Sequence, residues 1–333
     1  MMCIKPGRLG GRMLAAAAAI VLGMAAHAAH AKYPDQPITL IVPYAPGGAV
    51  DIVGRIIGRE LSQALGQSVI VENKSGFSGN IGAQWVKNAP HDGYTLLMAP
   101  TTSLAMIAKL LGKKATGYDL VKDFRVVSMV GELPILLMVN QSLQVHTLDQ
   151  LVAKLKAEPN KYSFGSSGTG TIEQVVGEMF RQREGVKIVH VPYRGAAPAM
   201  TDLMSGQIQL MFATSPTALA SLASGRANAI GVASLKRLPS LPNVPTLDEQ
   251  GLKGFTAQTM YGVLVPAGTP DSVVNVLNAA LSKALATDRV RDQFDKQAIL
   301  PMINTPQQAA SLLRNEVQKW NRVIDETGIK MTQ

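Results

Sequence analysis

The chain has 333 residues, 47% of them hydrophobic and 17% charged, and a formal net charge of +9. This length allows two domains with large cores. Aromatic residues make up only 5% of the chain, and Lys and Arg form no run, so we expect no nucleic-acid partner. The mild basicity suits an anionic ligand, but it is equally typical of exported proteins in general.

The first 31 residues have the pattern of a secretory signal peptide. Three basic residues precede the apolar run 13–26, and small residues follow up to Ala31. The run is shorter than the roughly 20 residues of a membrane span, so we expect export and cleavage after Ala31. The only cysteine, Cys3, would leave with this segment, and the net charge would fall from +9 by 3 to +6. The mature chain would then have no disulfide and no cysteine metal site.

After this segment, short runs of β-forming residues alternate with helical patterns. Strands are predicted at 38–42, 68–71, 95–98, 126–130, 135–139, 188–191, 208–212, 229–233 and 262–265. Helices are predicted at 50–65, 148–157, 172–183, 217–224, 271–286 and 307–327. Such alternation predicts an α/β fold of parallel sheets with helices on both faces.

The order of these elements also predicts how the domains divide. From about residue 256 the chain ends in two long helical patterns, and the strongest sheet candidates for them to cover lie far upstream. We therefore expect a discontinuous first domain, with the middle of the chain forming the second.

The stretch I-V-P-Y-A-P-G-G-A-V-D, residues 41–51, joins a strand to a helix. That helix has one apolar stripe, and Gly66 predicts its left-handed end. A helix N-terminus presents unpaired N–H groups and a partial positive charge, and Gly47 and Gly48 leave those groups accessible. The stretch has neither G-x-G-x-x-G nor G-K-[ST], so it favours a carboxylate over a phosphate. Asp51 either complements the helix dipole or contacts the ligand.

A second stretch, I-V-H-V-P-Y-R-G-A-A-P-A-M-T-D at 188–202, repeats the arrangement. A strand again ends in Val-Pro-Tyr, small residues follow, and we expect a helix to begin near Pro198. Arg194 would either pair with a carboxylate or stay solvated. The similarity is too short to indicate duplication, but it predicts two helix N-termini, one in each domain.

A third loop, F-G-S-S-G-T-G-T-I-E-Q, spans residues 164–174. Thr171 and Gln174 have the spacing of a capping box, which predicts a capped helix. Alternatively, Ser166, Ser167 and Thr169 offer hydroxyl groups to a ligand. The loop lacks the G-x-S-x-G of a hydrolase nucleophile.

Catalytic and metal-binding patterns are weak in this sequence. His91, His146 and His190 lack the spacing of zinc ligands, so we expect no metal and no cofactor. An exported enzyme acting on a carboxylic acid would have to use Asp51, Tyr44 or the hydroxyl groups near Ser166.

Three segments together resemble one known family. They are P-Y-A-P-G-G-A-V-D at 43–51, V-P-Y-R-G-A-A-P-A-M-T-D-L-M-S-G-Q-I-Q-L-M-F at 191–212, and R-L-P-S-L-P-N-V-P-T-L-D-E-Q-G-L at 237–252 followed by Y-G-V-L-V-P-A-G-T-P at 261–270. This order is similar to that of the Bug family, the extracytoplasmic solute receptors of tripartite tricarboxylate transporters, and it covers essentially the whole mature chain.

The resemblance implies a periplasmic receptor with a two-lobed, hinged fold, like type II periplasmic binding proteins, each lobe a mainly parallel sheet with flanking helices. One lobe would be 32–132 with 256–333 and the other 133–255. The ligand, a small organic carboxylate, would lie between them, held by backbone amides and bridging waters from the first stretch and from 193–198. We expect a monomer that meets membrane transporter subunits. A sensor that feeds a signalling partner remains the main alternative.

The predicted ligand-binding set combines these stretches. It comprises Tyr44, Ala45, Pro46, Gly47, Gly48, Asp51, Thr101, Ser103, Ser166, Ser167, Thr169, Tyr193, Arg194, Gly195 and Ala196. Where many relatives have His, this chain has Leu104 and Gln174, and where many have Asp it has Ala213. An acid at that last position could face a ligand cation, so its absence disfavours an amino acid as the ligand.

Overall fold

The computed structural model describes residues 1–2 and 33–329. The predicted signal peptide falls on residues 1–31, so nearly all of it, with Cys3 and the cleavage point after Ala31, lies outside the described residues. From Gln36 onward the chain forms one compact unit. Within the described ranges, no helix is both long enough and apolar enough to cross a membrane.

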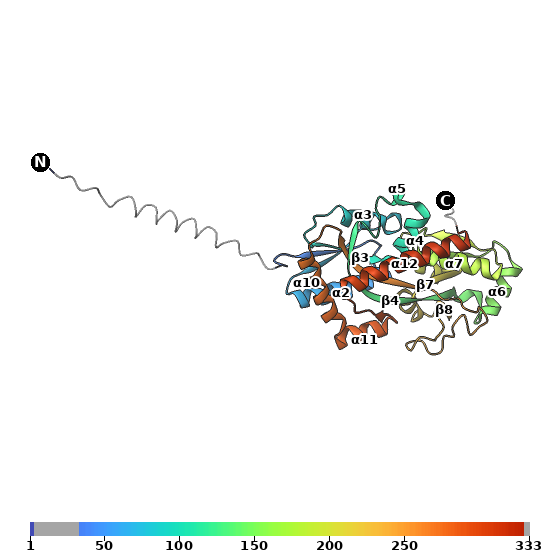
Figure 1. The fold of residues 1–333 in the computed structure, drawn as a ribbon. Coiled ribbons are helices and arrows are strands. Elements are labelled where there is room, and N and C mark those ends of the chain that lie inside the picture. The colour runs from blue at the N-terminus through green and yellow to red at the C-terminus, as the bar shows by residue number, and fades with distance from the viewer. Residues whose placement is uncertain (3–32, 330–333) are drawn as a thin grey trace. The chain divides into compact units, whose positions relative to one another are not determined.

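The strands of this unit belong to one mixed sheet flanked by helices (Figure 1). They are β1 (Ile38–Val42), β2 (Val69–Asn73), β3 (Thr95–Pro100), β4 (Phe124–Asn140), β5 (Ser163–Ser166), β6 (Val189–Pro192), β7 (Leu210–Thr214), β8 (Ala227–Val232), β9 (Gln258–Pro266) and β10 (Leu300–Pro301). The α/β fold class predicted from the alternating pattern is confirmed.

The helices begin mostly where a strand has just ended. They are α2 (Ala49–Leu65), α3 (Asn80–Lys87), α4 (Thr101–Leu111), α5 (Lys113–Thr116), α6 (Leu148–Ala157), α7 (Ile172–Glu184), α8 (Ala196–Ser205), α9 (Ser215–Leu222), α10 (Asp271–Leu285), α11 (Asp288–Lys296) and α12 (Pro306–Thr327), with short 3-10 turns η1 (Phe77–Gly79) and η2 (Gln141–Leu143). Gly66 ends α2 in the left-handed conformation, with φ of +67°, as its sequence predicts.

The sheet order is β2-β1-β3-β9-β4-β7-β5-β6, and β8 and β10 also pair with β4. Strand β1 pairs in parallel with β2 and β3, and β5 pairs in parallel with β6 and β7. Strands β4 and β9, in contrast, are antiparallel to all their partners. The expectation of mainly parallel sheets is therefore right for the two outer groups and wrong for the centre that joins them.

Strand β4 connects the two halves of the sheet. The sequence predicts two strands here, 126–130 and 135–139, but the structure has one continuous strand of 17 residues. Its residues up to Pro134 pair with β9, and those from Ile135 on pair with β7 and β8. Pro134, which reads as a strand breaker, lies where the partner changes, and there a missing N–H group costs little.

Two hydrophobic cores lie on either side of this junction, and α12 contributes to both. Ala309 and Leu313, near its start, pack with residues of β1, β3 and α4. Trp320 and Ile324, near its end, pack with residues of β5, β7 and α7. Figure 1 shows α12 running across the unit towards α7. The division into lobes at 132/133 and 255/256 stays a prediction, and α12 would span it.

Candidate functional site

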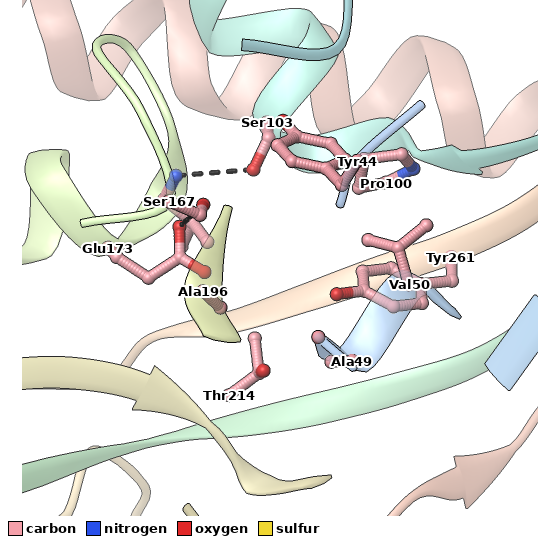
Figure 2. A pocket seen from close by; sticks show the side chains of 12 residues that line it. Tyr44, Ala49, Val50, Pro100, Ser103, Ser167, Glu173, Ala196, Thr214 and Tyr261 are labelled. Atoms are coloured by element: carbon pink, nitrogen blue, oxygen red, sulfur yellow. Dashed lines mark hydrogen bonds between the residues drawn. The ribbon is translucent and has the colours of Figure 1, made fainter. Parts of the chain in front are cut away.

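A pocket lies where the two parallel groups of strands meet. It comprises about 330 Å³ of space between atoms, part of it open to solvent. Its lining residues come from both predicted lobes and are shown in Figure 2: Tyr44, Gly48, Ala49, Val50, Pro100, Ser103, Ser167, Ile172, Glu173, Ala196, Thr214 and Tyr261.

Helix N-termini dominate this lining. In the described part of the chain, α2, α4, α7, α8 and α9 each place a cap or first-turn residue on the pocket wall. Each helix follows directly after β1, β3, β5, β6 or β7, so the pocket lies at the carboxyl ends of parallel strands, where α/β folds usually bind ligands. Each N-terminus carries roughly half a positive charge. The pocket is therefore suited to an anion.

Unpaired amides on the pocket wall include those at the starts of α2 and α8. The first helical bond of α2 runs from Ile52 N–H to the Gly48 carbonyl. Within the described residues, the N–H groups of Ala49, Val50 and Ala196 donate no hydrogen bond, although all three residues line the pocket. Buried N–H groups without partners are rare in proteins. These amides are therefore available to a ligand.

Asp51 and Gly47 have a structural role at the first corner, which we define as residues 43–50. The Asp51 carboxylate accepts the Gly47 N–H at 3.0 Å and forms an ion pair with Arg55 at 2.8 Å. Burial would raise the Asp51 pKa, but the hydrogen bonds from Arg55, Gly47 and Asn73 lower it overall. Neither residue lines the pocket, so the prediction that Asp51 contacts the ligand is not supported.

The two corners face each other. A methyl group added to Gly48 would lie 3.7 Å from the Cβ of Ala196, and one added to Gly195 would lie 3.3 Å from the Cβ of Ala45. Gly195, with φ of +151°, caps α8, which begins at Ala196, two residues before Pro198 and so near the predicted start. The second corner, residues 192–197, thus presents its amides directly opposite the first.

The tyrosines of the two corners differ. Tyr44 is buried against the pocket, and its hydroxyl donates to the Ser78 carbonyl at 2.8 Å. Burial, with the nearby Glu173 and other groups, raises the Tyr44 pKa well above its usual value. Tyr193 is half-buried outside the pocket and donates to Asp202 at 2.7 Å. Burial and this bond raise the Tyr193 pKa to about 12.

The third loop contributes one hydroxyl group to the pocket, that of Ser167, which donates to Glu173 at 2.8 Å. Ser166 is fully buried and bonds His190 at 2.7 Å, and burial lowers the His190 pKa to about 4. The predicted capping box is wrong, because the Gln174 side chain accepts the N–H of Gly170 and Thr171 donates to the Gly168 carbonyl.

Two further hydroxyl groups of the predicted set come from the start of α4. Thr101 is buried and donates to the Met260 carbonyl at 2.9 Å, whereas Ser103 lines the pocket and accepts the N–H of Ile172 at 3.2 Å. Of the predicted set, Tyr44, Gly48, Ser103, Ser167 and Ala196 line the pocket, and Ala45, Pro46, Gly47, Asp51, Thr101, Ser166, Thr169, Tyr193, Arg194 and Gly195 do not.

Sequence reasoning missed three polar side chains on the wall, those of Glu173, Thr214 and Tyr261. Glu173 occupies the first turn of α7, where an acid usually complements the helix dipole. Its position in the sequence therefore does not indicate a contact with a ligand. Tyr261 lies in β9 within a segment used only for the family resemblance. Burial raises the pKa of both Glu173 and Tyr261, and Glu173 adds to the rise at Tyr261.

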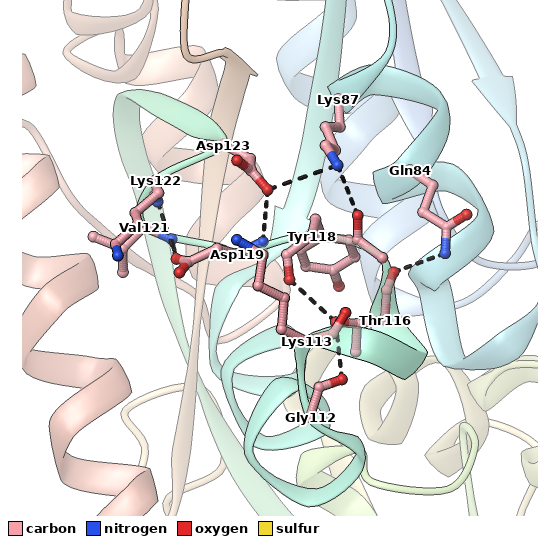
Figure 3. Close-up of polar contacts among 11 residues, drawn as sticks. Gln84, Lys87, Gly112, Lys113, Thr116, Tyr118, Asp119, Val121, Lys122 and Asp123 are labelled. Atoms are coloured by element: carbon pink, nitrogen blue, oxygen red, sulfur yellow. Dashed lines mark hydrogen bonds and ion pairs between the residues drawn. The ribbon is translucent and has the colours of Figure 1, made fainter.

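A second, larger hollow of about 670 Å³ lies beside α4, α5 and α12. Its polar groups mostly bind protein partners, as Figure 3 shows for Asp119, which accepts the N–H groups of Val121 and Lys122. Lys109 pairs with Asp325 at 2.7 Å. Among the described residues, no group of three or more His, Cys, Asp or Glu side chains could hold a metal ion.

A pocket lined by helix N-termini, between two halves of one mixed α/β sheet, defines a ligand-binding protein of the two-part α/β class. The model of the tripartite tricarboxylate transporter family receptor matches residues 53–329. The chain therefore belongs to this receptor family, as the resemblance implied, and its members are periplasmic binding proteins.

Individual relatives agree with this assignment. The chain is 35% identical to protein BugT of Bordetella pertussis over 93% of its own length and 94% of the relative's. A solved R. palustris protein with adipate is 31% identical, with a TM-score of 0.85 over 90% of this chain and 99% of that one. MatC from Rhodopseudomonas palustris, with bound malate, is 30% identical, with a TM-score of 0.81 over 88% of this chain and 100% of that one.

Proposed function

We propose that this chain is a periplasmic receptor that captures a small organic carboxylate in the pocket between the two corners. It would hand the ligand to the membrane subunits of a tripartite tricarboxylate transporter. Residues 1–31 would direct export and be removed, and the mature protein would act as a monomer.

One observation carries this proposal: unpaired amides of α2 and α8 border the same pocket from opposite sides. Ala49 and Val50 belong to one predicted lobe and Ala196 to the other. A carboxylate between them would accept hydrogen bonds from both sides and would lie at the positive ends of both helix dipoles. The relatives with adipate and malate carry ligands of this chemical class.

The same arrangement explains how binding would drive closure. A ligand shifts an open–closed equilibrium only if it contacts the two states differently. A carboxylate bound to both corners gains its second set of contacts only when the lobes approach. The chain would cross between the lobes in β4 and just before β9, with α12 packed against both cores, and rotation about such crossings is a common form of hinge motion.

The groups that an enzyme would use have structural partners instead. Asp51 holds the Gly47 N–H and Arg55, and Ser166 is buried against His190. Tyr44, the remaining candidate, donates its proton to a backbone carbonyl. These contacts favour binding over turnover.

Native mass spectrometry of freshly purified protein tests the proposal. We expect a monomer that carries a co-purified small acid, and calorimetry on refolded, ligand-free protein should show that this acid binds again. Product analysis of the same mixture should show the acid unchanged. Failure of every co-purified or added carboxylate to bind, or conversion of a bound acid, would contradict the proposed function.

A further inference from the structure

Glu173 is an acidic side chain in a pocket whose other polar groups suit an anion. It is the second residue of α7 and is only 4% exposed. In Figure 2 its carboxyl group lies beside Ser167, whose hydroxyl donates to it at 2.8 Å. The chain therefore supplies one carboxyl group of its own to the ligand pocket.

In the part of the chain that the structure describes, no cationic side chain balances this carboxyl group. Within residues 33–329, no Lys, Arg or His side chain forms an ion pair with Glu173. The titratable groups facing it from other elements are the phenols of Tyr44 and Tyr261. Burial raises the Glu173 pKa, although the Ser167 hydroxyl and its own N–H group oppose the rise. A buried carboxylate without a cation is costly.

The ligand can supply the missing cation. Three hydrogen bonds, from the Ser167 hydroxyl, the Glu173 N–H group and the Thr171 side chain, act to lower the Glu173 pKa and so favour its charged form against the effect of burial. A hydroxyl group on the ligand would leave the buried charge unbalanced, and a second ligand carboxylate nearby would repel it. An ammonium group on the ligand would donate a hydrogen bond to the Glu173 carboxylate and would also neutralise its charge. Ala49, Val50 and Ala196 line the same pocket as Glu173, so one small molecule would contact both the amides and this carboxyl group.

Building on the proposed function, we propose that Glu173 makes this receptor selective for small amino-carboxylates. The ligand's carboxylate would lie at the amides of α2 and α8, and its ammonium group would pair with Glu173. The family pattern placed a cation-facing acid where this chain has Ala213, and that departure disfavoured amino acids. The structure supplies the acid from α7 instead.

Calorimetry with matched pairs of probes tests this selectivity. Each pair differs only in the amino group: aspartate with succinate, glutamate with glutarate, alanine with propionate, and γ-aminobutyrate with butyrate. For refolded, ligand-free wild type, we expect the amino-bearing member of at least one pair to bind about tenfold or more tightly. Glu173→Gln keeps the shape and removes the charge, so it should abolish or reverse that preference.

Glu178→Gln is the matched control. Glu178 lies on the same helix, is 8% exposed and pairs with Arg181 away from the pocket, so this variant should keep the preference. If Glu173→Gln failed to fold, the wild-type preference would decide by itself. Equal or weaker binding of every amino-bearing member would overturn the inference and leave the proposed function standing. Absence of binding by all probes and by any co-purified acid would overturn both.

Discussion

The two corners of the pocket share a sequence pattern but use it differently. In each corner the sequence Val-Pro-Tyr lies at the end of a strand, and glycine then leads into a helix. Tyr44 in the first corner is buried on the pocket wall and fixed to the Ser78 carbonyl. Tyr193 in the second is half-buried outside the pocket and bound to Asp202. What the corners have in common is that each presents main-chain N–H groups at a helix N-terminus.

This comparison separates the groups that bind from those that support. Asp51 and Asp202 each hold their own corner in shape, through a backbone amide in one case and a tyrosine hydroxyl in the other. The unpaired groups that both corners turn towards the pocket are main-chain amides. Substitutions that block amides should therefore affect affinity, and substitutions of the supporting side chains should affect stability first.

The largest effect is expected for Gly48→Val. Gly48 has φ of −84°, which valine can adopt, so the fold should survive. The added side chain would reach Ala196 and cover the amides of α2. We expect the affinity for the tightest-binding carboxylate to fall more than about 100-fold in calorimetry. Ala267→Val, at an exposed site away from the pocket, is the control, and equal affinities for the two variants would place the ligand elsewhere.

Next in size is Asp51→Asn, which should destabilise the protein by about 2 kcal/mol at pH 7 in urea unfolding, because a buried, charge-assisted network is lost. Asp202→Asn should cost about 0.5 kcal/mol, because the new amide oxygen still accepts a hydrogen bond from the Tyr193 hydroxyl.

The folded-state pKa of Asp51 is lowered. Its stabilising effect is therefore fully present above the unfolded pKa near about 3.9 and is lost as pH falls through the folded value. The stability difference between wild type and Asp51→Asn should therefore begin to shrink below about pH 4, and a difference that stays constant with falling pH would contradict this assignment.

Tyr44→Phe and Tyr193→Phe compare the corners directly. The first leaves the Ser78 carbonyl without its donor next to the pocket, so we expect a loss of about 1–2 kcal/mol in stability and a measurable loss of affinity. The second removes a half-exposed bond and should cost about 0.5–1 kcal/mol with unchanged affinity. Unfolding and calorimetry on both variants measure this. If Tyr193→Phe lost affinity and Tyr44→Phe did not, the roles of the corners would be reversed.

The smallest effect is expected for Arg194→Ala. Arg194 is exposed and does not line the pocket, so the affinity for a carboxylate should change less than about threefold. A tenfold loss in the same titration would show that a side-chain ion pair, and not the backbone, holds the ligand.

The sequence predicted these corners well because their signals are local. Strand periodicity, glycine and the helix pattern fixed β1 and α2 to within a residue. The continuity of β4 was not predictable in this way, because the change of partner at Pro134 depends on strands that are distant in sequence. The strands β5 and β10 were not predicted, because they are short and have no clear alternation of polar and apolar residues.

The side-chain roles were harder to predict than the fold, for a similar reason. Asp51 and Ser166 are polar residues in functional loops, and only the fold shows that Arg55 and His190 already occupy them. Glu173 looks like an ordinary helix-start acid until burial places it in the pocket. Local sequence indicated unpaired amides at both loops because a helix N-terminus has unpaired N–H groups in any fold, but it did not separate the N–H of Gly47, which Asp51 accepts, from those of Ala49 and Val50.

A crystal structure of the protein with its co-purified or tightest-binding carboxylate tests the central claim most directly. The account predicts that carboxylate oxygens accept hydrogen bonds from backbone N–H groups in the first turns of both α2 and α8. Each bond would be about 3.2 Å or shorter, made directly or through one bridging water. A carboxylate bound through Arg194, or in the hollow beside α4 and α12, would contradict it.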